Sequence, residues 1–225
     1  MDKLKLKILV SELVLFIILG LLIFVPSWTV FYWQGWIYLL FFAISMLVMT
    51  LYFLKHDRAL MERRVNIGPK AEKKIIQKIL LSCLIIFMIG LFLLSSFDYR
   101  FHLSKISVFV VLFSNLLILA GFYIFFRVFK ENSFASATID LSKEQKVIST
   151  GPYSVVRHPM YSGALIICLF TPFALGSLLG ICLSVLIAVI IVFRIMDEEK
   201  FLKSNLAGYT DYCKKTRYRL IPYVW

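Results

Sequence analysis

The chain has 225 residues, of which 60% are hydrophobic and 17% charged, and its mean hydropathy is +0.85. A water-soluble domain needs a more polar surface than this composition supplies, so a soluble globular protein is excluded. The net charge of +12 would also suit nucleic acid. The basic residues flank apolar segments, however, where they set membrane topology and contact anionic lipid. We therefore predict an integral membrane protein with no nucleic-acid partner.

The apolar segments predict an all-α integral membrane protein with about six transmembrane helices, since one span takes about 20 apolar residues. A stretch from Met160 to Ile195 is too long for one span, and Thr171-Pro172-Phe173 and Gly176-Ser177 interrupt it. We predict that it forms a helical hairpin, the last two helices, whose arms barely reach across a bilayer. The four preceding spans are Ile8–Val25, Gln34–Leu54, Ile79–Phe97 and Ile106–Phe126.

Basic residues predict the orientation of these spans. All 25 Lys and Arg residues except Arg100 and Lys105 fall on one side of the predicted topology. The positive-inside rule makes that side cytoplasmic, with both termini inside. The opposite loop, Pro26–Trp36, is uncharged and rich in aromatic residues, as expected at a membrane interface. The four cysteines lack metal-ligand spacing and are expected to be free thiols.

Two polar clusters flank the hairpin on the predicted cytoplasmic side. In the first, Pro159 suits the first position of a helix, which puts His158 near its cap and unpaired backbone N–H groups at the membrane surface. Such a helix end binds anions readily. His158 and Tyr161, three residues apart, share a helix face. The alternative is an interfacial anchor in which Arg157 extends its side chain to the membrane surface.

The second cluster, Arg194–Glu199, lies where the hairpin ends. Its carboxylates could bind a cationic group, and Arg194 an anionic one. The alternative is an ordinary ion pair between Arg194 and Glu198, four residues apart on one helix face. Both clusters would meet at the cytoplasmic mouth of the hairpin, which predicts a cofactor pocket formed by the preceding loop and the C-terminal tail.

The ordered motifs resemble the isoprenylcysteine carboxyl methyltransferase family, and particularly its short microbial members. The resemblance covers roughly Arg58 to Pro222. It implies a methyltransferase core over residues 55–225, preceded by two transmembrane helices in residues 1–54. The matching segments are Gly151-Pro152-Tyr153, Arg157-His158-Pro159-x-Tyr161-x-Gly163, Arg194-x-x-x-Glu198-Glu199, Gly208-Tyr209-x-x-Tyr212 and Arg219-Leu220-Ile221-Pro222.

The resemblance implies S-adenosylmethionine as the methyl donor and a lipophilic or lipidated acceptor whose carboxylate is methylated. No metal is expected, because the cysteine and histidine residues lack metal-ligand spacing. A carboxylate is already nucleophilic at neutral pH, so no general base is required. Arg194 is the expected catalytic residue and would orient the acceptor. The expected donor-binding residues are Gln145, Lys146, Val147, Ile148, Tyr153, His158, Pro159, Met160, Tyr161, Glu198 and Glu199.

Three alternatives stay open at this point. Phospholipid amine methyltransferases share similar membrane motifs, so a lipid headgroup is a possible acceptor. NADPH-dependent membrane reductases also carry Arg-His-Pro-x-Tyr, but they usually have Asn in place of Met160 and Gly-Glu in place of Gly163-Ala164. A non-enzymatic membrane protein would explain the spans but not the two clusters.

Overall fold

The computed structural model describes residues 3–64, 72, 74–134 and 146–225, and within them the regular structure is entirely helical. This confirms the predicted all-α class. The elements are α1 (Lys3–Ser27), α2 (Trp33–His56), α3 (Arg58–Arg64), α4 (Ile75–Phe101), α5 (Val108–Glu131), the 3-10 helix η2 (Gly151–Ser154), α6 (Pro159–Ala174), α7 (Gly180–Asn205) and α8 (Tyr209–Lys215).

Five helices in the described part of the chain are long and apolar enough to cross a membrane: α1, α2, α4, α5 and α7. The predicted hairpin is present as α6 and α7, but its arms are unequal. The 16 residues of α6 extend about 24 Å, whereas the 26 residues of α7 extend about 39 Å at 1.5 Å per residue. The expectation that both arms barely reach across is therefore wrong for α7.

Pro172 does not break the hairpin where the sequence suggested, because it lies within the last turn of α6. A proline cannot donate to the carbonyl four residues earlier, here that of Cys168. Ser184 of α7 supplies the missing donor, and its hydroxyl lies 2.8 Å from that carbonyl oxygen. The chain turns after Ala174, at the second predicted interruption, where Gly176 adopts a φ of +72° that a side chain would disfavour.

Asp98 fixes the turn between α6 and α7. One oxygen of its buried carboxylate accepts hydrogen bonds from the hydroxyl of Ser177 at 2.5 Å and from that of Ser104 at 2.6 Å. The same oxygen accepts the backbone N–H of Leu179 at 3.2 Å. These bonds attach the hairpin turn to the end of α4, so α6 and α7 extend from a fixed point toward the other end of the molecule.

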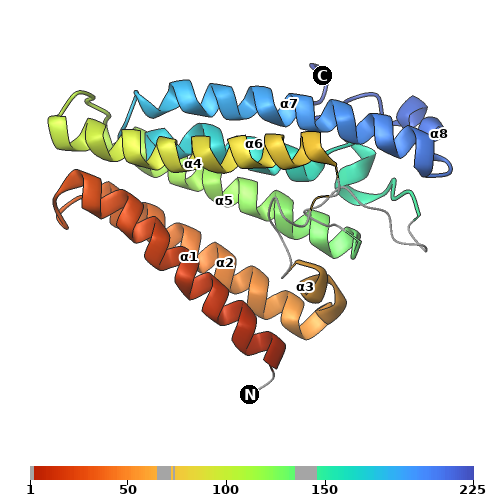
Figure 1. Cartoon of the computed structure of the whole chain (residues 1–225), viewed down its shortest axis with the longest axis horizontal. Coiled ribbons are helices and arrows are strands. Elements are labelled where there is room, and N and C mark those ends of the chain that lie inside the picture. Colours follow the sequence, from red (N-terminus) through yellow and green to blue (C-terminus); the bar gives the residue numbers. More distant parts are fainter. Residues whose placement is uncertain (1–2, 65–71, 73, 135–145) are drawn as a thin grey trace.

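The helices form two groups that diverge (Figure 1). Helices α4, α5, α6 and α7 run side by side, while α1 and α2 form a pair inclined to them. Gly121 of α5 and Gly163 of α6 allow these two helices to approach closely, since a Cβ on either would lie 2.9 Å from the other's carbonyl oxygen. The inclined pair meets the bundle near the α1–α2 turn and separates from it toward the N-terminus.

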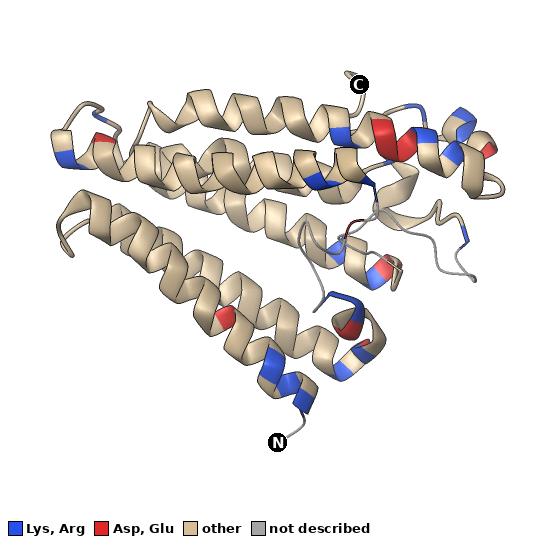
Figure 2. Cartoon of the chain, in the orientation of Figure 1, with Lys and Arg blue, Asp and Glu red and all other residues tan. Residues whose placement is uncertain are grey.

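Charged residues gather at the two ends of the molecule (Figure 2). Most Lys and Arg residues lie at the end that holds the N-terminus, α3 and α8, and we call this the basic end. Arg100 and Lys105 lie at the opposite end, beside the α4–α5 connection. The grouping agrees with the split found in the sequence, and the assignment of the basic end to the cytoplasm stays a prediction. All four cysteines are free thiols, as predicted.

Cysteine labelling in intact cells tests this orientation. In a variant without native cysteines, a cysteine at Ser149 should react with a membrane-impermeant maleimide only after permeabilisation, because Ser149 lies at the basic end. A cysteine at Leu103, in the connection between α4 and α5, should react in intact cells. Both sites are exposed, so accessibility within the protein does not limit either reaction. The reverse pattern would reject the predicted topology.

Candidate functional site

The two sequence clusters meet at the basic end, as predicted, where the start of α6 faces the last third of α7. His158 is the N-cap residue of α6 and Pro159 its first residue. The Tyr161 hydroxyl donates to Glu198 Oε2 at 2.8 Å, and Arg194 Nε donates to the same hydroxyl oxygen at 2.9 Å. The fold thus links three predicted site residues, from two helices, in one chain of hydrogen bonds.

Glu199 lies behind this chain, in a separate buried ion cluster. Its Oε1 accepts from Arg157 Nε at 2.7 Å and lies 3.3 Å from His158 Nε2, while its Oε2 accepts from Arg219 Nε at 3.0 Å. Only 4% of the Glu199 side chain is exposed. A buried carboxylate needs such compensation, because an unpaired charge in the interior costs several kcal/mol. In this structure Glu199 therefore orients His158.

Arg157 is part of the same cluster and is not an interfacial anchor. It is 8% exposed, and its Nη1 donates to the backbone oxygens of Thr216 at 2.9 Å and Arg217 at 2.8 Å. Burial alone would lower its pKa, but the hydrogen bond and charge of Glu199 raise the pKa above the ordinary value. The alternative in which Arg157 extends to the membrane surface is wrong, since its guanidinium points into the protein.

The C-terminal tail closes over the start of α6. The backbone N–H groups of Arg157 and His158 donate to the carbonyls of Tyr218 and Arg219, each at 2.9 Å. The Ser162 hydroxyl donates to the carbonyl of Leu220 at 2.6 Å. These contacts explain why the Arg219-Leu220-Ile221-Pro222 motif accompanies the first cluster. They place the tail against the start of α6, and the pocket of loop and tail stays a prediction.

Tyr153 joins the preceding loop to this assembly. Its hydroxyl oxygen accepts from Asn132 Nδ2 at 2.9 Å, and its backbone oxygen accepts from the Tyr212 hydroxyl at 2.7 Å. Burial is the main cause that raises the pKa of Tyr153 to about 12, although the hydrogen bond from Asn132 lowers it. Tyr153 is therefore a neutral phenol at physiological pH and cannot act there as a general base. Together with Met160 it packs against an apolar cluster that includes Phe53.

Arg194 is buried deeper than the sequence suggested. Its Nη1 donates to Gln77 Oε1 at 2.9 Å and its Nη2 pairs with the carboxylate of Glu72. Gln77 in turn donates to Asp197 Oδ2 at 2.5 Å. With Nε bound to Tyr161, all three guanidinium nitrogens are engaged. Glu72 and Gln77 lie more than 110 residues before Arg194 in the chain, so no motif spacing indicated them.

Glu198 differs from the other acids of the site. It accepts a hydrogen bond from the neutral phenol of Tyr161, and no cationic group lies within ion-pair distance among the described residues. Arg194, by contrast, is paired with Glu72, and Arg157 with Glu199. The half-buried Glu198 carboxylate is thus available to a cationic ligand at the basic end.

The remaining predicted residues are divided between described and undescribed parts of the chain. Lys146, Val147 and Ile148 are described as irregular chain, with Lys146 exposed and the other two half-buried. A Cβ on Gly208 would lie 4.0 Å from Val147 Cγ2, so this stretch runs beside the turn that precedes α8. Gln145 lies outside the described residues. The described residues contain no group of three potential metal ligands.

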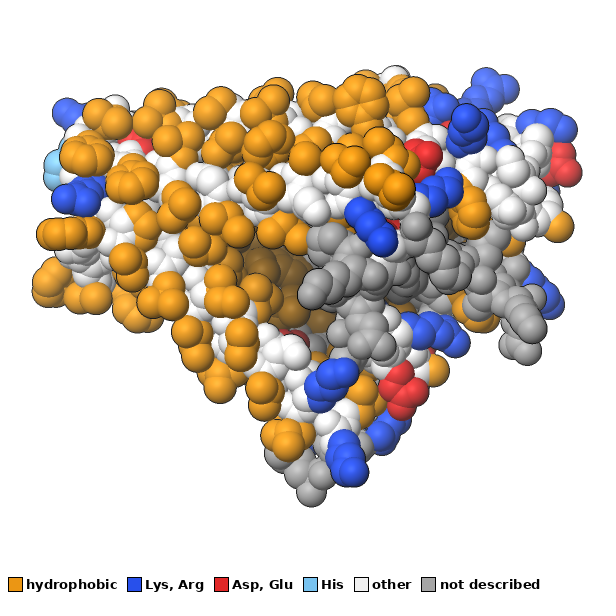
Figure 3. Space-filling model, in the orientation of Figure 1, with side chains coloured by type: hydrophobic (Ala, Val, Ile, Leu, Met, Phe, Trp, Pro, Cys, Tyr) orange, Lys and Arg blue, Asp and Glu red, His pale blue; other side chains and the backbone are white. Residues whose placement is uncertain are grey.

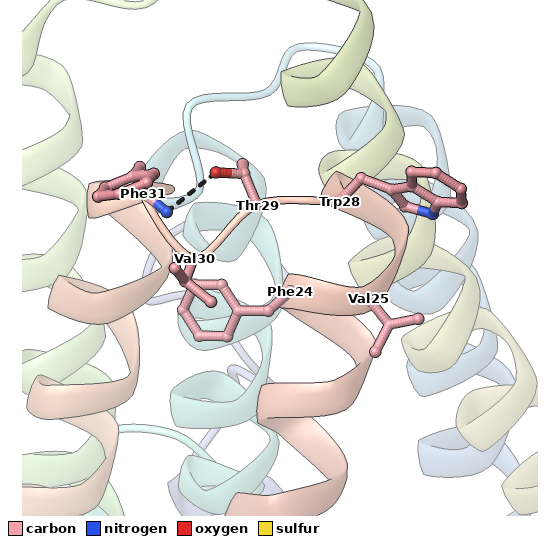
Figure 4. A pocket seen from close by; sticks show the side chains of 6 residues that line it. All are labelled: Phe24, Val25, Trp28, Thr29, Val30 and Phe31. Atoms are coloured by element: carbon pink, nitrogen blue, oxygen red, sulfur yellow. Dashed lines mark hydrogen bonds between the residues drawn. The ribbon is translucent and has the colours of Figure 1, made fainter.

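A hollow at the opposite end of the molecule carries no such chemistry (Figure 4). It is lined by residues around the α1–α2 turn, and none of them has an ionisable side chain. The backbone N–H of Phe31 donates to Thr29 Oγ1 at 3.1 Å, which fixes the turn locally. Its lining residues are Phe24, Val25, Trp28, Thr29, Val30 and Phe31.

Comparison with known proteins points to the same part of the chain. Residues 109–207 match a family model described as phospholipid methyltransferase, a range that covers nearly all of α5 and contains α6 and α7. The predicted donor-binding residues fall inside it. This match supports a membrane methyltransferase.

A second similarity is shorter. Over 91 residues the chain is 33% identical to the Delta(14)-sterol reductase TM7SF2 of Mus musculus. The aligned part is 39% of this chain and 22% of the reductase, so the likeness is to about a fifth of that protein.

Proposed function

We propose that the protein is an S-adenosylmethionine-dependent membrane methyltransferase that acts on a lipophilic acceptor at its basic end. The observation that carries the proposal is the half-buried Glu198 carboxylate, which Tyr161 orients and no described cation neutralises. It lies within the segment that matches the phospholipid methyltransferase model. The donor carries an ammonium and a sulfonium, and a carboxylate suits either.

The residues present fit the rest of the donor as well. Pro159 has no N–H, but the first-turn N–H groups of Met160 and Tyr161 point out of the start of α6. With the positive end of the helix dipole they would bind the donor's carboxylate. His158, held by Glu199, and the neutral Tyr153 would line the same pocket. The donor supplies an electrophilic methyl group when bound, and these side chains would orient it and exclude water.

We favour a carboxylate acceptor that Arg194 orients, as in isoprenylcysteine carboxyl methyltransferases. The guanidinium is planar and can hold a carboxylate by two hydrogen bonds. In this structure Glu72 takes one of the guanidinium donors, so a carboxylate acceptor would exchange with Glu72. A phospholipid amine is the second candidate, because Glu72 already balances the charge of Arg194 and because the matched family is described as phospholipid methyltransferase.

Equilibrium binding of the purified protein to S-adenosylmethionine and to NADPH tests the proposal directly. We expect saturable binding of S-adenosylmethionine and none of NADPH. The variant Asp211→Asn should bind S-adenosylmethionine as the wild-type protein does, because Asp211 is a fully exposed acid paired with Lys214 at the same end of the molecule. It is the matched control for the substitution Glu198→Gln. Binding of NADPH and not of S-adenosylmethionine would reject the methyltransferase proposal in favour of a reductase, in line with the similarity to the sterol reductase.

A further inference from the structure

Glu12 is an acid inside an apolar helix, and the site at the basic end does not use it. It is the one acidic residue of α1, and α2 has none. Its exposed fraction is 9%. An ionisable side chain within a membrane-spanning helix is costly and usually serves a ligand or a proton path. A purely structural role would be a hydrogen bond between neighbouring helices.

The hydrogen bonding of Glu12 is incomplete. The Thr50 hydroxyl of α2 donates to Glu12 Oε1, which accounts for one carboxylate oxygen. The other oxygen, Oε2, has no hydrogen-bond or ion-pair partner among the residues that the structure describes. A buried carboxylate that is ionised requires a cation or several hydrogen bonds to offset its desolvation. One donor from a neutral hydroxyl does not meet that requirement.

The level of Glu12 in the membrane suits a lipid headgroup. Glu12 follows Lys7 by five residues in α1, and Thr50 precedes Lys55 by five residues in α2. At 1.5 Å per residue, both residues lie about 7–8 Å along their helices from these lysines, on the side away from the basic end. They are therefore on the same side as Glu198, just below the depth at which lysine side chains reach the membrane surface.

A recess lies between the inclined pair α1–α2 and the α4–α5 side of the bundle (Figure 3). Its visible walls are hydrophobic, and acidic atoms appear at its rim. Within the four helices around it, Glu12 is the one acid away from a helix end, because Asp98 of α4 and Glu131 of α5 lie in last turns. An apolar recess suits a hydrocarbon chain, and a carboxylate oxygen without a hydrogen-bond partner suits a cationic head group.

We infer that Glu12 and Thr50 form a binding site for the protonated amine of a membrane amphiphile whose chain lies in this recess. The ammonium donates to Glu12 Oε2 and cancels the carboxylate charge, while Thr50 holds the other oxygen in place. The inference goes beyond the proposed function, because the bound amine is a membrane amphiphile distinct from the carboxylate acceptor favoured there. Binding itself does not depend on methyl transfer.

The test compares three single-chain probes of equal length with the purified protein in phosphatidylcholine nanodiscs: hexadecylamine, hexadecanol and hexadecanoate. Competition against a fluorescent alkylamine measures each affinity. The wild-type protein should prefer the amine to the alcohol by about tenfold or more, because a charge-assisted hydrogen bond replaces a neutral one. The carboxylate probe should bind weakest. Equal affinities for amine and alcohol in the wild-type protein would overturn the inference without any variant.

Two variants assign the preference to Glu12. Glu12→Gln still accepts the hydrogen bond from Thr50 but carries no charge, so its preference for the amine should disappear. Ser45→Ala should keep the preference, since Ser45 is a buried α2 residue that donates to Phe41 of its own helix. A preference that survives in Glu12→Gln rejects this site and leaves Glu12 as a contact between helices.

S-adenosylmethionine binding, measured on the same samples, separates this inference from the proposed function. Loss of the amine preference with intact donor binding confirms that Glu12 serves the amphiphile alone. An absence of donor binding in the wild-type protein would reject the proposed methyltransferase. The site at Glu12 would still be supported if the wild-type protein preferred the amine and Glu12→Gln did not.

Discussion

Glu198→Gln is expected to weaken S-adenosylmethionine binding by about ten- to more than a hundredfold. The substitution keeps the shape of the side chain and an oxygen that can accept from Tyr161, but it removes the charge that would hold the donor's cationic group. A charge-assisted hydrogen bond contributes about 1.5–3 kcal/mol, and 1.4 kcal/mol is a factor of ten. Isothermal titration calorimetry on the purified variant measures the change.

Glu199→Gln is the informative comparison, because the two residues are neighbours in α7 with different surroundings. Glu199 neutralises Arg157 and Arg219 in a buried cluster. Its substitution leaves those charges uncompensated, which typically costs about 3–5 kcal/mol. We therefore expect Glu199→Gln to lower the thermal unfolding temperature, and Glu198→Gln to leave it nearly unchanged. An unaltered donor affinity in a folded Glu198→Gln protein would contradict the proposed donor site.

The sequence predicted the membrane architecture well, because spans depend on local composition. Hydropathy alone located the helices that contain Ile8–Val25 and Gln34–Leu54, and the proline rule placed the start of α6 at Pro159. The interior of the hairpin was predicted less well. Pro172 leaves the carbonyl of Cys168 without its helical donor, and Ser184 of the neighbouring helix donates to it instead. That contact is tertiary, so local sequence does not indicate it.

The site was predicted in part for a related reason. The motifs correctly brought Tyr161, Arg194 and Glu198 together. They did not distinguish Glu198 from Glu199, because adjacent residues on a helix point in different directions and only the fold shows what each side chain faces. Nor did they indicate Glu72, whose carboxylate reaches Arg194 from the connection before α4. Partners that are distant in sequence and lack a motif are found only in three dimensions.

Arg194→Lys is expected to reduce methyl transfer to a carboxylate acceptor by about a hundredfold while donor binding falls only a few-fold. Lysine keeps the positive charge beside Glu72, so the charge balance of the buried site is preserved. It cannot reproduce the planar fork that donates at once to Tyr161, Gln77 and Glu72. An acceptor carboxylate would therefore lose its two-point attachment, which is worth about 3 kcal/mol for a charged pair.

Donor affinity and turnover measured separately on this one variant decide the role of Arg194. Arg58→Lys is the matched control, because Arg58 forms an exposed pair with Glu62 on α3 and should tolerate lysine in both assays. Full activity of Arg194→Lys would show that only its charge is required, and would refute its role in orienting the acceptor. A donor affinity that falls as far as in Glu198→Gln would instead place Arg194 in the donor pocket. It would act there through Tyr161, whose hydroxyl lies between the guanidinium and the Glu198 carboxylate.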